Sequence, residues 1–238
     1  MARPQRFLLV AGAVAVVALG GAARASACGS GGYSYAGVGA AQSAFGISAT
    51  VSAVDAFAVL HGHVAGWVGV GGPGEGPRGT NEWLQVGLSA FPSVTGGDLY
   101  YEVAQPSHFP VYHQVDANLP AGEPFKLSVL EMHRRPEWWR VWVNRRPVSK
   151  AIHLPESYDR WGPMATAESW DGGTGGACNT FLYRFHGVRI AGAPGGGWHP
   201  LLGGYPIRSS VSRIRRSRGS FLAAEGAQAL QLLPTLKP

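Results

Sequence analysis

Two short segments of the chain carry side chains that could act together on a carbonyl group. Residues 83–88 and 165–170 both have strand-like composition, and they contain Gln85 and Glu168. Successive side chains of a strand point to opposite faces, so each of these polar groups lies opposite small or aliphatic neighbours. A carboxylate can take a proton from water, and a carboxamide can donate a hydrogen bond to a developing oxyanion. We predict that Gln85 and Glu168 form a catalytic pair facing one groove.

The same alternation predicts which residues surround this pair. The aliphatic sides of the strands, for example Leu84, Val86 and Leu88, would pack between two sheets. The opposite sides would then form the groove. We expect its substrate-binding residues to be Trp67, Trp83, Tyr100, Glu102 and Trp170.

The elements that must position these groups are strands. The chain contains 35 glycines and 17 prolines, and turn residues at this density between short apolar runs indicate an all-β antiparallel sandwich or barrel. Only residues 220–233 have helical composition. The expected strands span residues 45–54, 64–70, 83–88, 99–103, 125–131, 138–143, 151–154, 164–170, 180–190 and 207–214.

The first 27 residues have the pattern of an export signal. Arg3 and Arg6 precede an apolar run over 7–20, and small residues at 25–27 supply a cleavage site. The run is short for a bilayer span, which needs about 20 residues, and no later segment qualifies. We expect a secreted monomer with a signal peptide over 1–27, one β-sandwich domain over 28–222 and a C-terminal tail over 223–238.

The two cysteines have two interpretations. In an oxidising compartment Cys28 and Cys178 would form a disulfide, which is the prediction we favour. Alternatively, Cys28 follows the cleavage site directly and would carry a lipid anchor.

The charge pattern and the histidines suggest no further partner. Removal of the signal leaves 17 basic and 14 acidic side chains, which is only mildly basic. No aromatic–basic recognition motif accompanies the arginines at 208–218, so we expect a solvated strand face or tail and no nucleic acid. His61 and His63 form a possible metal pair without a convincing third ligand, so we expect no metal and no cofactor.

In the order of its motifs the chain resembles the eqolisins, which are glutamic peptidases built on a concanavalin-like β-sandwich. The matching segments are residues 66–72, 84–87, 100–102 and 167–168. The resemblance implies that Gln85 is the catalytic glutamine, Glu168 the catalytic glutamate and Glu102 a supporting acid. The chain departs from the pattern at Gly71, where the family usually has aspartate, and at Ser169, where it usually has tryptophan.

The sequence is therefore compatible with three alternative functions. A secreted endopeptidase would cleave extended polypeptides lying across the aromatic groove. A non-catalytic module of the same fold would bind glycans or peptides on its rings, and fold alone does not choose between the two. A glycoside hydrolase would need two carboxylates, which Glu102 and Glu168 could supply, but it would leave Gln85 without a role.

Overall fold

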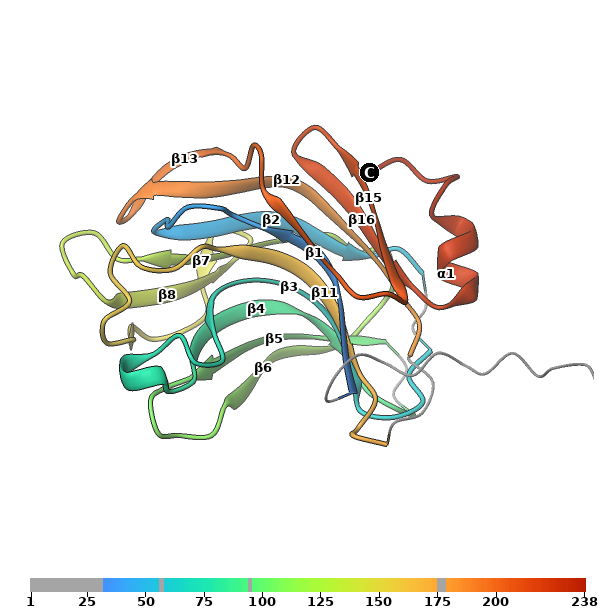
Figure 1. Ribbon diagram of the computed structural model, residues 1–238, viewed down its shortest axis with the longest axis horizontal. Helices are drawn as coiled ribbons and strands as arrows, with labels where there is room; N and C mark the ends of the chain where they lie inside the picture. The colour runs from blue at the N-terminus through green and yellow to red at the C-terminus, as the bar shows by residue number, and fades with distance from the viewer. Residues whose placement is uncertain (1–31, 56–57, 94–95, 175–178) are drawn as a thin grey trace, which may run out of the picture.

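The computed structural model describes residues 32–55, 58–93, 96–174 and 179–238. These residues form two antiparallel sheets packed face to face, with one short α-helix (Figure 1). The expected all-β sandwich is therefore confirmed. The residues expected to form the signal peptide, and both Cys28 and Cys178, lie outside the described residues.

The seven-stranded sheet holds the strands on which the candidate groups lie. Its order is β14-β1-β11-β3-β4-β5-β6, and all its neighbours run antiparallel. In that order the strands span Tyr205–Arg208, Tyr33–Gly39, Met164–Trp170, His63–Gly72, Glu82–Ala90, Gly97–Ala104 and Val111–Leu119. A 3-10 turn, η2 (Pro77–Gly79), lies between β3 and β4.

The second sheet has the order β10-β8-β7-β2-β12-β16-β15, with β13 paired to β12 and β9 paired to β8. Along that order its strands span Ile152–His153, Trp138–Val143, Phe125–Glu131, Gly46–Ala53, Phe181–Ala193, Ser220–Glu225 and Ser212–Ser217; β13 spans Gly196–Pro200 and β9 spans Arg146–Pro147. The helix α1 (Ala227–Leu232) packs on the outer face of this sheet, where its buried Ala229, with Leu233 just after the helix, forms one cluster with Leu182, Leu222 and Ala224.

The core lies between the sheets and is built from the aliphatic faces that strand alternation predicts. Leu84, Val86 and Leu88 of β4 are buried there beside Ala165 and Ala167 of β11. Burial of apolar area at about 25 cal/mol per Å² drives this packing, and Gln85 and Glu168 lie on the opposite faces of these two strands. The predicted faces of these strands are thus confirmed.

One glycine permits a close contact between the sheets. A Cβ on Gly66 of β3 would lie 2.5 Å from the ring of Tyr183, which is fully buried. The Tyr183 hydroxyl donates a hydrogen bond to the carbonyl oxygen of Leu88, 3.1 Å away. The bare backbone at Gly66 therefore lets a ring from β12 reach across to β4 and join the two sheets.

Several expected elements differ from those observed. Residues 207–214 do not form one strand, since β14 and β15 belong to different sheets. The helical expectation for 220–233 is wrong in its first half, because Ser220–Glu225 is a buried strand between β12 and β15. β1 and β6 were not expected at all. β6 is an edge strand with mostly exposed residues, so it lacks the apolar alternation by which a half-buried strand is found.

Candidate functional site

The strand register places Gln85 and Glu168 on the same face of the seven-stranded sheet. Gln85 of β4 pairs with Gly69 of β3, and Glu168 of β11 pairs with Ala65 of the same strand. Positions 65, 67 and 69 share one face of β3, so the two groups flank this central strand diagonally with Trp67 between them. This face points away from the sandwich core.

A cleft of about 530 Å³ lies on this face, and both Gln85 and Glu168 line it. Its other walls are mainly aromatic and apolar. The remaining lining residues are Tyr33, Tyr35, His63, Trp67, Val70, Gly71, Gly72, Pro73, Trp83, Glu102, Met164, Thr166 and Ile207. The cleft therefore combines an amide, two carboxyl groups and one imidazole with a largely apolar wall.

Glu168 lies in a tightly enclosed position. Its side chain is only 10% exposed, and its Oε1 atom lies 3.4 Å from Nε2 of His63. Tyr33 and Tyr35 of the neighbouring β1 pair with Trp170 and Glu168. Burial, followed by the negative charge of Glu168, raises the pKa of Tyr33 to about 12 and that of Tyr35 further. Both phenols are thus neutral beside Glu168 across the physiological pH range.

Gln85 is held by a hydrogen bond to a residue of the neighbouring strand β5. Its Nε2 donates to the hydroxyl of Tyr100, 3.1 Å away, and both residues are buried. The Tyr100 ring stacks on Tyr112 of β6 with centroids 4.8 Å apart. A carboxamide has two N–H donors, so the bond to Tyr100 fixes the group and leaves its second N–H for another acceptor.

Glu102 forms a second acidic position beside Gln85. The two residues are paired across β4 and β5, and the indole Nε1 of Trp83 donates a 2.9 Å hydrogen bond to Glu102 Oε1. Burial raises the pKa of Glu102, and the charge of Glu168 adds to this, while the bond from Trp83 and the nearby His63 oppose it. Glu102 therefore holds a proton to higher pH than an ordinary glutamate.

The predicted substrate-binding residues are only partly brought together. Trp67, Trp83 and Glu102 line the cleft. Tyr100 is buried against Trp67 and Ala65, and Trp170 lies on the same sheet face, where it stacks on Tyr33 with centroids 5.9 Å apart. Neither of these two residues belongs to the cleft lining.

Sequence reasoning missed three residues that complete the site, namely Tyr33, Tyr35 and His63. The two tyrosines alternate within residues 33–39, which was the signal for an additional strand. The sequence indicates His63 only as half of a possible metal pair with His61, and the described part of the chain holds no group of three residues that could bind a metal. Its contact with Glu168 depends on the pairing of β3 with β11.

Gly71, the position where this chain departs from the eqolisin pattern, has a local structural explanation. Its φ of +74° is strained for residues with a side chain, and a Cβ would lie 2.3 Å from the carbonyl oxygen of Glu82. An aspartate would fit only if this end of β3 had a different course. The departure is thus tied to the local backbone conformation at Gly71, which lines the cleft.

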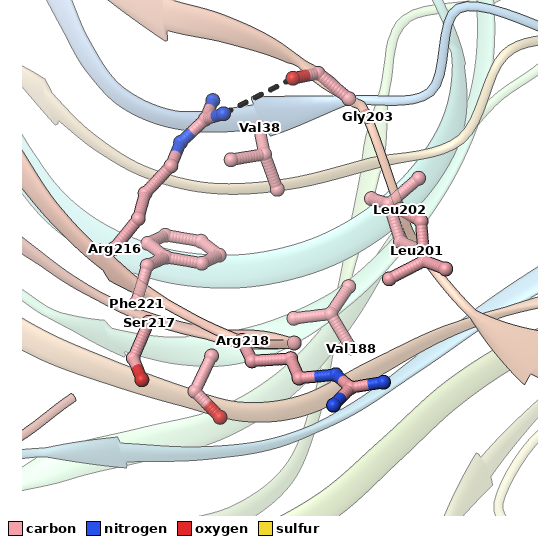
Figure 2. Close-up of a pocket in the computed structure, with 12 residues that line it drawn as sticks. Val38, Val188, Leu201, Leu202, Gly203, Arg216, Ser217, Arg218 and Phe221 are labelled. Carbon is pink, nitrogen blue, oxygen red and sulfur yellow. Dashed lines mark hydrogen bonds between the residues drawn. The ribbon is translucent and has the colours of Figure 1, made fainter.

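A second, smaller cavity of about 220 Å³ lies apart from this face, where β1, β12, residues 201–204 and the β15–β16 turn meet. Figure 2 shows Val38, Leu201, Leu202 and Phe221 among its walls, with the side chains of Arg216 and Arg218 lying apart from one another. Arg216 donates a hydrogen bond to the carbonyl oxygen of Gly204, 3.1 Å away. One cation of this cavity is therefore already engaged by the protein's own backbone.

The arginines near the C-terminus have other internal partners. Nη1 of Arg215 donates hydrogen bonds to the carbonyl oxygens of Leu233, Pro234 and Leu236. These acceptors lie at the end of α1 and just beyond it, where helix carbonyls lack intrahelical partners. The basic segment thus fastens the C-terminal residues onto β15. No helix within the described ranges is both long and apolar enough to cross a membrane.

The chain resembles known proteins in its three-dimensional structure. No protein family model and no curated protein matches the chain. The crystal structure of scytalido-glutamic peptidase with a peptide-based transition state analogue is similar, with a TM-score of 0.56 and 16% identity over 81% of this chain and 98% of that one. SCP-B, a member of the eqolisin family in complex with the tripeptide Ala-Ile-His, has a TM-score of 0.52 with the same identity and coverage. At this identity the likeness shows the fold: the described chain has the β-sandwich of the eqolisin structures.

Proposed function

We propose that this protein is a secreted peptidase that hydrolyses peptide bonds of extended polypeptides with Gln85 and Glu168. The observation that carries the proposal is the placement of both side chains on one sheet face, lining one cleft on either side of β3. The structural likeness to glutamic peptidases supports the same choice. Since fold does not imply function, the chemistry of the pair must carry the argument.

In the proposed reaction, Gln85 and Glu168 both act when water attacks the substrate carbonyl, and Glu168 acts again when the amine leaves. The Glu168 carboxylate takes a proton from a water molecule, whose oxygen forms a bond to the substrate carbonyl carbon. The free N–H of Gln85 donates a hydrogen bond to the carbonyl oxygen as it becomes an oxyanion. The protonated Glu168 then gives its proton to the amide nitrogen, the C–N bond breaks, and the amine leaves.

The geometry also defines what the substrate must bridge. Gln85 is hydrogen-bonded to Tyr100, and Glu168 is in contact with His63, so each group has its own support. The substrate carbonyl and the attacking water would occupy the space above Trp67 between them. Tyr33, Tyr35, Met164 and Ile207 would favour apolar substrate side chains on the Glu168 side of the cleft.

The alternatives are less well supported by the same site. A glycan-binding surface would present its rings to the sugar, yet Trp67 is 7% exposed and Tyr100 is 2% exposed. A glycoside hydrolase would pair Glu102 with Glu168, but β3 and β4 both lie between the strands that carry them, whereas only β3 separates Gln85 from Glu168. The amide–carboxylate pair is thus the closer combination.

The test is hydrolysis of an unfolded protein by the purified secreted chain from pH 2 to 8. We expect Glu168→Gln to abolish cleavage and Gln85→Ala to lower the rate about 10²- to 10³-fold. Glu123→Gln, a substitution at an exposed loop position, is the matched control and should cleave like the wild type. Equal activity of the wild type and Glu168→Gln would end the catalytic assignment. Binding on a glycan array without any proteolysis would favour the binding module instead.

A further inference from the structure

His63 is the one basic side chain among the described residues that line the cleft. It begins β3, pairs with Trp170 of β11 and places Nε2 3.4 Å from Oε1 of Glu168. Its side chain is 22% exposed, so the imidazole lies at the rim and the carboxylate lies deeper. The ring therefore reaches Glu168 from the solvent side.

Three aromatic rings fix the orientation of the imidazole. Its centroid lies 6.2 Å from Tyr33, 6.0 Å from Phe91 and 5.7 Å from Trp170. The Tyr33 contact is edge-to-face and the other two are tilted, which are favourable arrangements for such rings. The rings come from β1, from β11 and from the residue that follows β4, so they pack against the imidazole from three separate segments.

The backbone on both sides of this contact is also tied together. Asn179 is 1% exposed, and its Nδ2 donates to the carbonyl oxygens of His61, His63 and Trp170 at 2.8, 3.3 and 2.9 Å. Its Oδ1 accepts hydrogen bonds from the amides of Leu60 and His61. A single buried side chain thus holds the start of β3 in register with the end of β11, and with it His63 beside Glu168.

We propose that His63 is the positioning residue of Glu168, holding its carboxylate at one angle in the cleft. This inference rests on the proposed function of Glu168 as the proton-transferring group. Nε2 can donate to the carboxylate both in the tautomer that carries the proton there and in the protonated ring. The charged ring would in addition offset the cost of burying the carboxylate. The other titratable groups at this position are Glu102, Tyr33, Tyr35 and Tyr100.

The first test distinguishes the contribution of the N–H donor of His63 from that of its aromatic ring. His63→Phe keeps an aromatic ring against Tyr33, Phe91 and Trp170 but removes the donor. We expect it to lower kcat about 10- to 100-fold with little change in KM, since misplacing a catalytic group by about 1 Å costs on that order. His63→Gln restores an N–H donor and should recover most of this loss. The control is His61→Gln, an exposed neighbour that does not line the cleft, which should behave as the wild type.

The second test needs no activity. In the wild type at neutral pH, the proton on Nε2 of His63 should give a downfield side-chain NMR signal protected from exchange, and Glu168→Leu should remove it. If the wild type hydrolyses nothing but shows this signal, the proposed function fails and the His63–Glu168 contact stands. The inference on His63 is overturned if the signal is missing or survives in Glu168→Leu, if His63→Phe keeps wild-type kcat, or if His63→Gln is as impaired as His63→Phe.

Discussion

The buried carboxyl group of Glu82 predicts how the unfolding free energy of the protein depends on pH. It opens β4 with its side chain toward the core, is fully buried, and neither carboxylate oxygen has a hydrogen-bond partner among the described residues. Burial raises its pKa to about 7, with Glu137 and Glu156 adding to this and Arg160 opposing it. An unpaired buried carboxylate disfavours its charged form. The folded protein must therefore lose stability when this group ionises.

The magnitude follows from the pKa difference. The ordinary value is 4.5 and the folded value is about 7, and each pH unit of difference is worth about 1.36 kcal/mol. Below pH 4.5 the group is protonated in both the folded and the unfolded chain, so its stabilising contribution is fully present. As pH rises through 4.5 to 7 the unfolded chain ionises first. The protein then loses about 3 kcal/mol of unfolding free energy by pH 8.

Glu82→Gln removes this pH dependence while keeping the shape of the side chain. We expect the variant to match the wild type at pH 4 and to exceed its unfolding free energy by about 3 kcal/mol at pH 8. For a chain of this size that corresponds to a melting temperature about 6–12 °C higher. The assay is urea unfolding followed by tryptophan fluorescence at pH 4 to 8, with Glu123→Gln as the exposed control. A gap between Glu82→Gln and the wild type that stays constant over this pH range would refute the reasoning.

Two further predictions concern stability and the C-terminal residues. Glu225 is buried and accepts a hydrogen bond from Ser34, and burial raises its pKa to about 7. Between pH 4.5 and 7, Glu225→Gln should therefore lose less unfolding free energy than the wild type, as measured by the same urea titrations. An equal loss in the variant and the wild type would contradict this. Arg215→Ala removes the donor to three carbonyl oxygens after α1, at a cost of about 1.5–3 kcal/mol for hydrogen bonds to a charged group. Amide hydrogen exchange in α1 should be faster in the variant, while exchange in β3 and β11 stays as in the wild type. Equal exchange rates in α1 of the variant and the wild type would show that the helix does not depend on Arg215.

Much of the sheet face around the cleft could be predicted from the sequence. Gln85 and Glu168 each stand opposite residues such as Val86 and Ala167 that can only gain by burial. In a strand this alternation fixes which side chains leave the core, whatever the strand pairing. The prediction of the all-β fold succeeded for the same local reason, since turn residues mark the strand ends at Gly72 and Asn144.

Strand order and register were decided only by the tertiary structure, because they depend on pairing between segments far apart in the chain. The contact between His63 and Glu168 spans 105 positions, and no local pattern indicates it. Likewise, Tyr33 and Tyr35 reach the cleft because β1 pairs with β11. The sequence by itself determined which side chains face away from the core. The packing of the two sheets decided which of them meet, since long-range pairing is selected by the burial of the whole core rather than by any single segment.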